Sequence, residues 1–103
     1  MAAGYKFGTG SLGVSFADFE AQLRAQGFDE VLEKKYPPSA VIDTHVHAFS
    51  PKALVVQGEM WLTVDGHTEH LKPGSTFELD AQVPHAERYG SQGTTYWVGR
   101  RLA

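Results

Sequence analysis

The sequence predicts an all-β domain with one short helix near its N-terminus. Strand-like segments recur at even spacing from residue 28 onward, and turn signals such as Asp65-Gly66 and Pro73-Gly74 separate them. Such a series is typical of a sandwich or a barrel. The 103 residues fit one domain. We divide it into an N-terminal segment with the helix, residues 1–27, and a barrel, residues 28–103.

The helix is expected from Phe16 to Gln26. Ser15 can cap its first turn, and Asp18 follows three residues later, as in a capping box. Gly27 provides a C-terminal stop. Three apolar side chains of this segment fall on one helix face, which should hold the helix against the barrel: Phe16, Phe19 and Leu23.

The strands are expected over short segments that alternate apolar and polar residues. Their ranges are 31–36, 40–47, 53–57, 59–64, 67–71, 75–79, 85–89 and 94–100. Asp65-Gly66 predicts a tight hairpin, and the stretch from Gly90 to Gly93 predicts another. Met60, Leu62 and Val64 share one strand face, which we assign to the core.

Composition excludes several classes of function. The net charge is -3, and the nine Lys and Arg residues are scattered, so nucleic acid is not an expected partner. Without cysteine there are no disulfides, thiolate metal sites or cysteine nucleophiles. The N-terminus has no signal-peptide pattern, and no apolar stretch approaches the length of a membrane span. We therefore expect a cytoplasmic protein without a membrane partner.

Three histidines form a candidate metal site. His45 and His47 are two residues apart, so on a strand both imidazoles emerge from one face. His85 follows a Val-Pro turn and begins a late strand, which in an antiparallel barrel can lie beside the first pair. Three converging imidazoles suit a divalent transition metal and leave positions for water or substrate.

The remaining two histidines predict no metal site. His67 follows the Asp65-Gly66 turn, where side chains are usually exposed. His70 lies on the opposite face of the same short strand and has no second histidine two residues away. We interpret both as surface side chains, since unpaired surface histidines seldom bind metal.

The histidine pattern resembles the two sequence motifs of the cupin superfamily. His45-Val46-His47 and Gly58 match the first motif, in which His-x-His precedes a glutamate and then a glycine. Gly74 and His85 match the second motif at its spacing. The resemblance spans roughly residues 39–98 and implies a double-stranded β-helix, the cupin jelly-roll barrel. The short N-terminal helix would lie outside this barrel.

The sequence departs from the family pattern where a glutamate usually completes the metal site. Pro51 and Lys52 stand at its positions, Ser39 replaces the first glycine, and Tyr89 replaces the final asparagine. The resemblance therefore implies the variant that binds Fe, Mn, Ni, Cu or Zn through three histidines alone: His45, His47 and His85. Three neutral ligands leave the ion its full charge, which favours an anionic or chelating substrate.

Glu87 is the one candidate for a catalytic carboxylate. It lies two residues after His85 and so shares its face on a regular strand. We favour the alternative, in which Glu87 pairs with Lys52 or an arginine and has no catalytic role, because ion pairs are common for strand carboxylates near basic residues.

The resemblance leaves two classes of function open. One is a metal-dependent enzyme of the dioxygenase, isomerase or lyase type, which acts on a small oxygenated substrate. The other is a non-catalytic module that binds or senses a small ligand or metal. Fold analogy does not choose a reaction. Because small cupins often pair, the resemblance also implies a homodimer.

Overall fold

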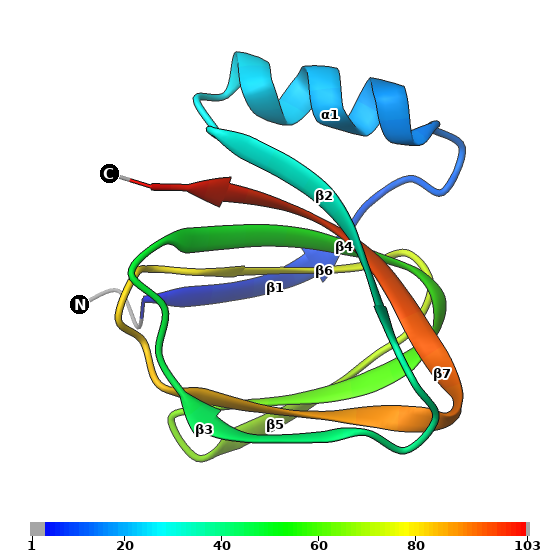
Figure 1. Cartoon of the computed structure of the whole chain (residues 1–103), viewed down its shortest axis with the longest axis vertical. Coiled ribbons are helices and arrows are strands. Elements are labelled where there is room, and N and C mark those ends of the chain that lie inside the picture. Colours follow the sequence, from blue (N-terminus) through cyan, green and yellow to red (C-terminus); the bar gives the residue numbers. More distant parts are fainter. Residues whose placement is uncertain (1–3, 103) are drawn as a thin grey trace.

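The computed structural model describes residues 4–102 and confirms the all-β fold with one helix (Figure 1). In chain order the elements are β1 Tyr5–Thr9, α1 Phe16–Ala25, β2 Glu30–Tyr36, β3 Val41–His45, β4 Ser50–Val64, β5 His67–Leu71, β6 Ser75–Leu79 and β7 His85–Arg101. All pairings between these strands are antiparallel.

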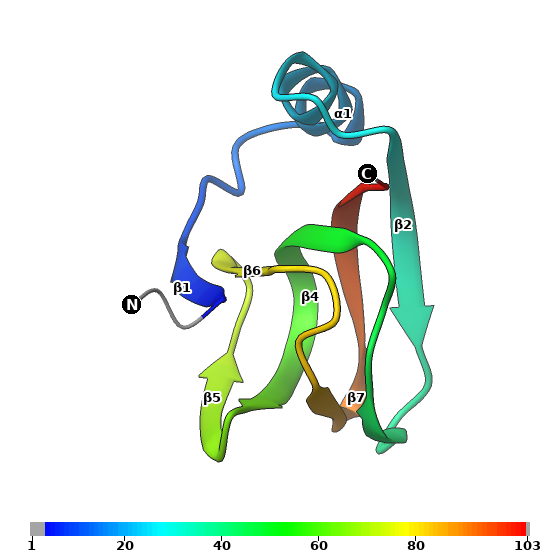
Figure 2. The same cartoon turned by 90° about the vertical axis from the view of Figure 1, so that its left-hand side faces the viewer.

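Two long strands, β4 and β7, bend and contribute to both layers of the barrel (Figure 1). The first half of β4 and the second half of β7 form one layer with β1, β6 and β2. Their other halves form the second layer with β5 and β3. In Figure 2, the edge strands β1 and β2 of the first layer lie on opposite sides of the molecule. This arrangement is the predicted jelly roll.

The predicted breaks in β4 and β7 are wrong, because both strands continue through them. The expected pair of strands at residues 53–57 and 59–64 is a single strand with register shifts around Gly58. The expected hairpin from Gly90 to Gly93 is a bend inside β7. Gly58 and Gly93 have φ angles of 75° and 79°, which glycine adopts readily. Both strands therefore bend without separating.

The helix begins as predicted, and the N-terminal segment also provides a strand. Ser15 Oγ accepts a hydrogen bond from the Asp18 amide at 3.1 Å, and the Asp18 side chain bonds back to the Ser15 amide. Phe19 and Leu23 are buried against the outer face of the first layer. Strand β1, which the sequence pattern did not indicate, pairs with β6. No helix within residues 4–102 is long and apolar enough to cross a membrane.

The main core lies between the two layers. The predicted core face of β4 is confirmed, since Met60, Leu62 and Val64 are completely buried. Phe77 and Leu79 of β6 pack in the same cluster. Apolar side chains fill one end of the barrel, whereas its other end holds polar residues from β2, β3 and β7.

Candidate metal centre

The first strand pair of the site brings two histidines together. His45 is the last residue of β3, His85 is the first residue of β7, and the two are register partners in the antiparallel pair. The predicted approach of the late strand to the first histidine pair is therefore confirmed. The expected strand to residue 47 ends at His45. His47 follows in an irregular segment, which is held in place where the Gln82 amide donates to the His47 carbonyl at 2.8 Å.

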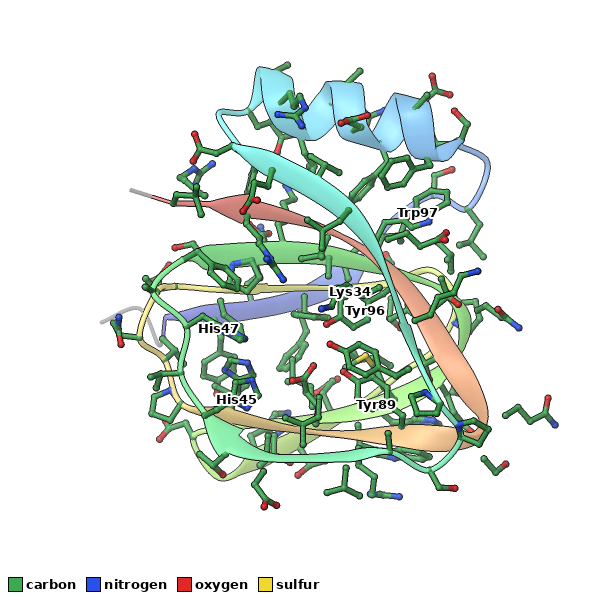
Figure 3. All side chains as sticks on the ribbon, in the orientation of Figure 1. Lys34, His45, His47, Tyr89, Tyr96 and Trp97 are labelled. Carbon is green, nitrogen blue, oxygen red and sulfur yellow. The ribbon has the colours of Figure 1, made fainter. Side chains whose placement is uncertain are left out.

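The three imidazoles form one compact cluster. Each offers a nitrogen atom, and these nitrogens lie within 4.8 Å of one another. The ring centroid of His45 is 4.7 Å from that of His47 and 4.3 Å from that of His85. Figure 3 shows His45 and His47 side by side at one end of the barrel. This compactness is what a single ion needs from three side chains.

Backbone carbonyls orient two of the rings. His45 Nδ1 lies 2.8 Å from the Asp43 carbonyl oxygen, and His85 Nδ1 lies 2.9 Å from the Val83 carbonyl oxygen. A carbonyl only accepts, so each Nδ1 carries a proton, and Nε2 is the nitrogen through which each ring can bind a metal. Metal-binding histidines commonly use such contacts to fix their tautomer.

The third ring, that of His47, is held by stacking and kept neutral. It stacks on Phe49, with centroids 4.4 Å apart and planes 16° from parallel. Burial above all, and then the nearby charges of His85, His45, Arg100 and Lys34, lower the pKa of His47 from 6.5 to about 4. A metal ligand must be deprotonated, so this ring is ready to bind at neutral pH.

Glu87 lies in the same cluster, which contradicts the favoured interpretation of a pair with Lys52 or an arginine. The buried carboxylate accepts a hydrogen bond from the Tyr89 hydroxyl at 2.5 Å, and its other oxygen lies 3.4 Å from His45 Nε2. Lys52 instead donates to Gln26. Strand alternation turns Glu87 inward, as it does His85.

Three tyrosines beside Glu87 were not identified from the sequence as part of the site. Tyr36 stacks on Tyr89 with centroids 4.1 Å apart, and its hydroxyl lies 3.4 Å from that of Tyr96. Burial, above all, raises the pKa of Tyr89 and of Tyr96 well above its usual range, and the Glu87 charge contributes. Both hydroxyls therefore stay protonated and available as hydrogen-bond donors. The alternation of β7 was the available signal, because Glu87 and Tyr89 share a face.

The remaining histidines lie outside the cluster, as expected. His67 Nε2 contacts Glu69 at 2.7 Å, and His70 Nε2 contacts Glu59 at 2.6 Å. The His67 side chain is 56% exposed. Neither residue belongs to a group of three metal-ligating side chains among the residues that the structure describes.

The three histidines and Glu87 line a cavity of about 250 Å³ at the polar end of the barrel. Borderline nitrogen ligands suit the first-row divalent ions from Mn to Zn. The donor set present in the chain, three neutral imidazoles with one carboxylate beside them, fits such an ion. The cavity is smaller than those that bind drug-sized ligands, so it suits a small molecule.

The chain belongs to the cupin domain family, whose model matches residues 32–98. No curated protein matches the sequence. Both histidine motifs lie within the matched range. The family assignment therefore agrees with the resemblance that the histidine spacing carries.

Solved structures with low sequence identity share the fold. An RmlC-like cupin from Shewanella frigidimarina NCIMB 400 is 21% identical with a TM-score of 0.66; the match covers 100% of this chain and 80% of that one. The polyketide cyclase RemF from Streptomyces resistomycificus is 24% identical with a TM-score of 0.62. The match covers 78% of this chain and 60% of that one.

A third structure, of the DMSP lyases RdDddP and RnDddQII, is 24% identical with a TM-score of 0.64. The match covers 69% of this chain and 37% of that one. The chain thus spans less than two thirds of both the lyase and the cyclase chains. At these identities the likeness shows the fold alone.

Proposed function

We propose that the protein is a metal-dependent enzyme that binds one divalent transition ion through His45, His47 and His85. The observation that supports this most directly is the convergence of three imidazole nitrogens within 4.8 Å in a cavity. Two of these rings have their Nδ1 protons donated to backbone carbonyls, so the Nε2 atoms are free to coordinate.

The substrate in this proposal is a small oxygenated molecule, and the reaction is of the dioxygenase, isomerase or lyase type. A bound Fe, Mn, Ni, Cu or Zn ion would supply Lewis-acid or redox chemistry. Two structural neighbours are a lyase and a cyclase, which agrees with an enzymatic use of this fold. They do not specify the reaction here.

Glu87 is the residue we assign to proton transfer. Its carboxylate lies at the coordinating edge of His45, within reach of a substrate oxygen in the cavity. The Tyr89 hydroxyl donates to it, which orients the carboxylate and leaves its other oxygen to accept a proton. Glu87 is buried beside the tyrosine cluster, which limits the access of water to this group.

Metal content tests the proposal directly. Tag-free protein purified without chelators should contain about one equivalent of metal per chain by inductively coupled plasma mass spectrometry. Alanine variants of His45, His47 and His85 should lose this metal while circular dichroism shows the fold retained. Alanine variants of His67 and His70 are the matched controls and should keep it.

Three outcomes would decide against the enzyme. Protein that takes up no metal even after reconstitution, or equal retention in all five histidine variants, would refute the three-histidine site. A small ligand that binds tightly at the metal and is recovered unchanged would instead support the alternative, a non-catalytic binding or sensing module.

The proposal also includes a homodimer in the cytoplasm, without a nucleic-acid or membrane partner. Among the described residues strand β3 pairs with β7 alone, so its other edge is available to a second copy of the chain. Light scattering on the purified protein measures the mass in solution. A monomer at all concentrations would refute the homodimer without affecting the metal site.

A further inference from the structure

Two cations on the inner faces of strands share the cavity with the histidines. In β2, Leu32 and Tyr36 pack against the core, so Lys34 between them also faces inward. In β7, Tyr96 and Val98 are buried in the core, and Arg100 continues the same face. Both Lys34 and Arg100 line the cavity, and Figure 3 shows Lys34 beside Tyr96 within the barrel.

Neither cation has an acidic partner among residues 4–102. The ion pairs of this part of the chain join other groups, including the neighbouring Lys35, which contacts Glu33 at 3.7 Å. Arg100 Nε is buried and makes no hydrogen bond. An unsatisfied donor of this kind costs free energy unless a ligand or water completes it.

Stacking holds the Arg100 guanidinium against Phe49, the aromatic ring that also stacks on His47. Its central carbon lies 4.6 Å from the centroid of the Phe49 ring, and Phe49 stacks in turn on His47. A planar guanidinium fixed on an aromatic face presents its N–H groups in one plane, the geometry that recognises a carboxylate. Because Arg100 and His47 line the same cavity, a carboxylate bound by Arg100 shares that cavity with the proposed metal site.

The charges in the cavity favour one anionic group of limited charge. Lys34 and Arg100 are positive, Glu87 is an acidic group, and the histidine ligands are neutral in the metal-bound form. Without metal, the two cations exceed the one carboxylate by a single positive charge, which one carboxylate group of a ligand balances. A bound divalent ion adds two positive charges and strengthens the attraction for any anion, so the preference for a carboxylate over a doubly charged phosphate is expected in the metal-free protein.

We propose that the cavity binds small organic carboxylates, whose carboxylate group is held by Arg100 and Lys34 while a second oxygen faces the three histidines. This inference rests on the proposed function for the role of the second oxygen, and it specifies the substrate class of the same site. The cation pair itself is a property of the chain with or without metal.

Isothermal titration calorimetry with matched probes tests the inference. We would titrate 2-hydroxybutanoate, its uncharged analogue 2-hydroxybutanamide and inorganic phosphate into metal-free and zinc-loaded protein. The carboxylate should bind more tightly than the amide in both forms, and more tightly than phosphate in the metal-free protein. Arg100→Gln and Lys34→Gln should each weaken carboxylate binding about 10- to 100-fold, the effect of losing a charge-assisted hydrogen bond.

The adjacent residues of each strand provide matched controls. Arg101 and Lys35 carry the same charges but face outward, where Arg101 donates to the Gln26 carbonyl and Lys35 pairs with Glu33. Arg101→Gln and Lys35→Gln should leave carboxylate binding unchanged. All four variants should keep their metal, which separates a lost cation from a damaged fold.

The results distinguish failure of the inference from failure of the proposed function. Equal binding of carboxylate and amide, tighter binding of phosphate to the metal-free protein, or unchanged binding in Arg100→Gln would each overturn the inference while the metal content stands. Absence of metal in the wild-type protein would refute the proposed function. The preference of metal-free protein for the carboxylate would then still test the cation pair.

Discussion

The carboxylate of Glu87 lies 3.4 Å from Nε2 of His45, one of the three imidazoles whose nitrogen atoms lie within 4.8 Å of one another. Since His45 Nδ1 is occupied by the Asp43 carbonyl, this Nε2 is the atom available to a metal. The chain lacks the glutamate that usually follows His-x-His in the first motif. Glu87, two residues after His85, places a carboxylate beside the three histidines instead. A group at this position affects both metal affinity and proton transfer.

Replacing Glu87 should weaken metal binding without unfolding the protein. Glu87→Gln keeps the size of the side chain and an oxygen that accepts from Tyr89, but it removes the negative charge beside the ion. We expect metal affinity to fall about 10- to 100-fold, as for other groups that support metal ligands. Competition with a chromophoric chelator measures this change. Glu69→Gln, which alters the contact of His67, should have no effect, and an equal loss in both variants would contradict the assignment.

Metal should stabilise the folded protein, because the three ligands are brought together only by folding. At a free metal concentration of about 100 times Kd, binding to the native state alone contributes about 2.7 kcal/mol. For a domain of this size the melting temperature should rise by roughly 10–20 °C. Scanning calorimetry with and without chelator measures the shift. The shift should vanish in His47→Ala and persist in His70→Ala, and its persistence in both would exclude His47 as a ligand.

The positions of the three histidines followed from the sequence because local rules determine them. A spacing of two residues places His45 and His47 near one another, and the start of a late antiparallel strand places His85 opposite His45. The role of Glu87 did not follow. Its partners depend on which side chains point into the barrel, and Lys52, the expected partner, points outward to Gln26.

The bends in β4 and β7 show a second limit of local patterns. Gly90 and Gly93 resemble a hairpin turn, and Gly58 resembles a strand end, but these glycines permit a bend where two paired strands cross between layers. Strand β1 was missed for a related reason. Its five residues have no strong pattern of their own and are ordered by pairing with β6.

The capping contact at the start of α1 should contribute measurably to stability. Ser15→Ala removes the hydroxyl that accepts from the Asp18 amide, and losses of this kind cost about 1 kcal/mol. Urea denaturation measures the free energy of unfolding. Ser11→Ala removes a comparable bond to the Gly13 amide outside the helix and should change stability by less than about 0.5 kcal/mol. Equal costs for the two variants would show that the cap contributes nothing specific.

The close approach of Gly58 to Gly93 should make Gly58 the least replaceable glycine of the barrel. A Cβ atom at Gly58 would lie 2.0 Å from the Gly93 carbonyl oxygen, whereas one at Gly66 would meet nothing within 4 Å. Their φ angles, 75° and 77°, are nearly the same. Gly66→Ala therefore measures the backbone strain alone, about 1–2 kcal/mol. Gly58→Ala adds a clash that only separation of β4 from β7 can relieve, so its loss in urea denaturation should be larger by about 1–3 kcal/mol. If the two variants lose the same stability, the strands do not approach as closely at this bend as the structure indicates.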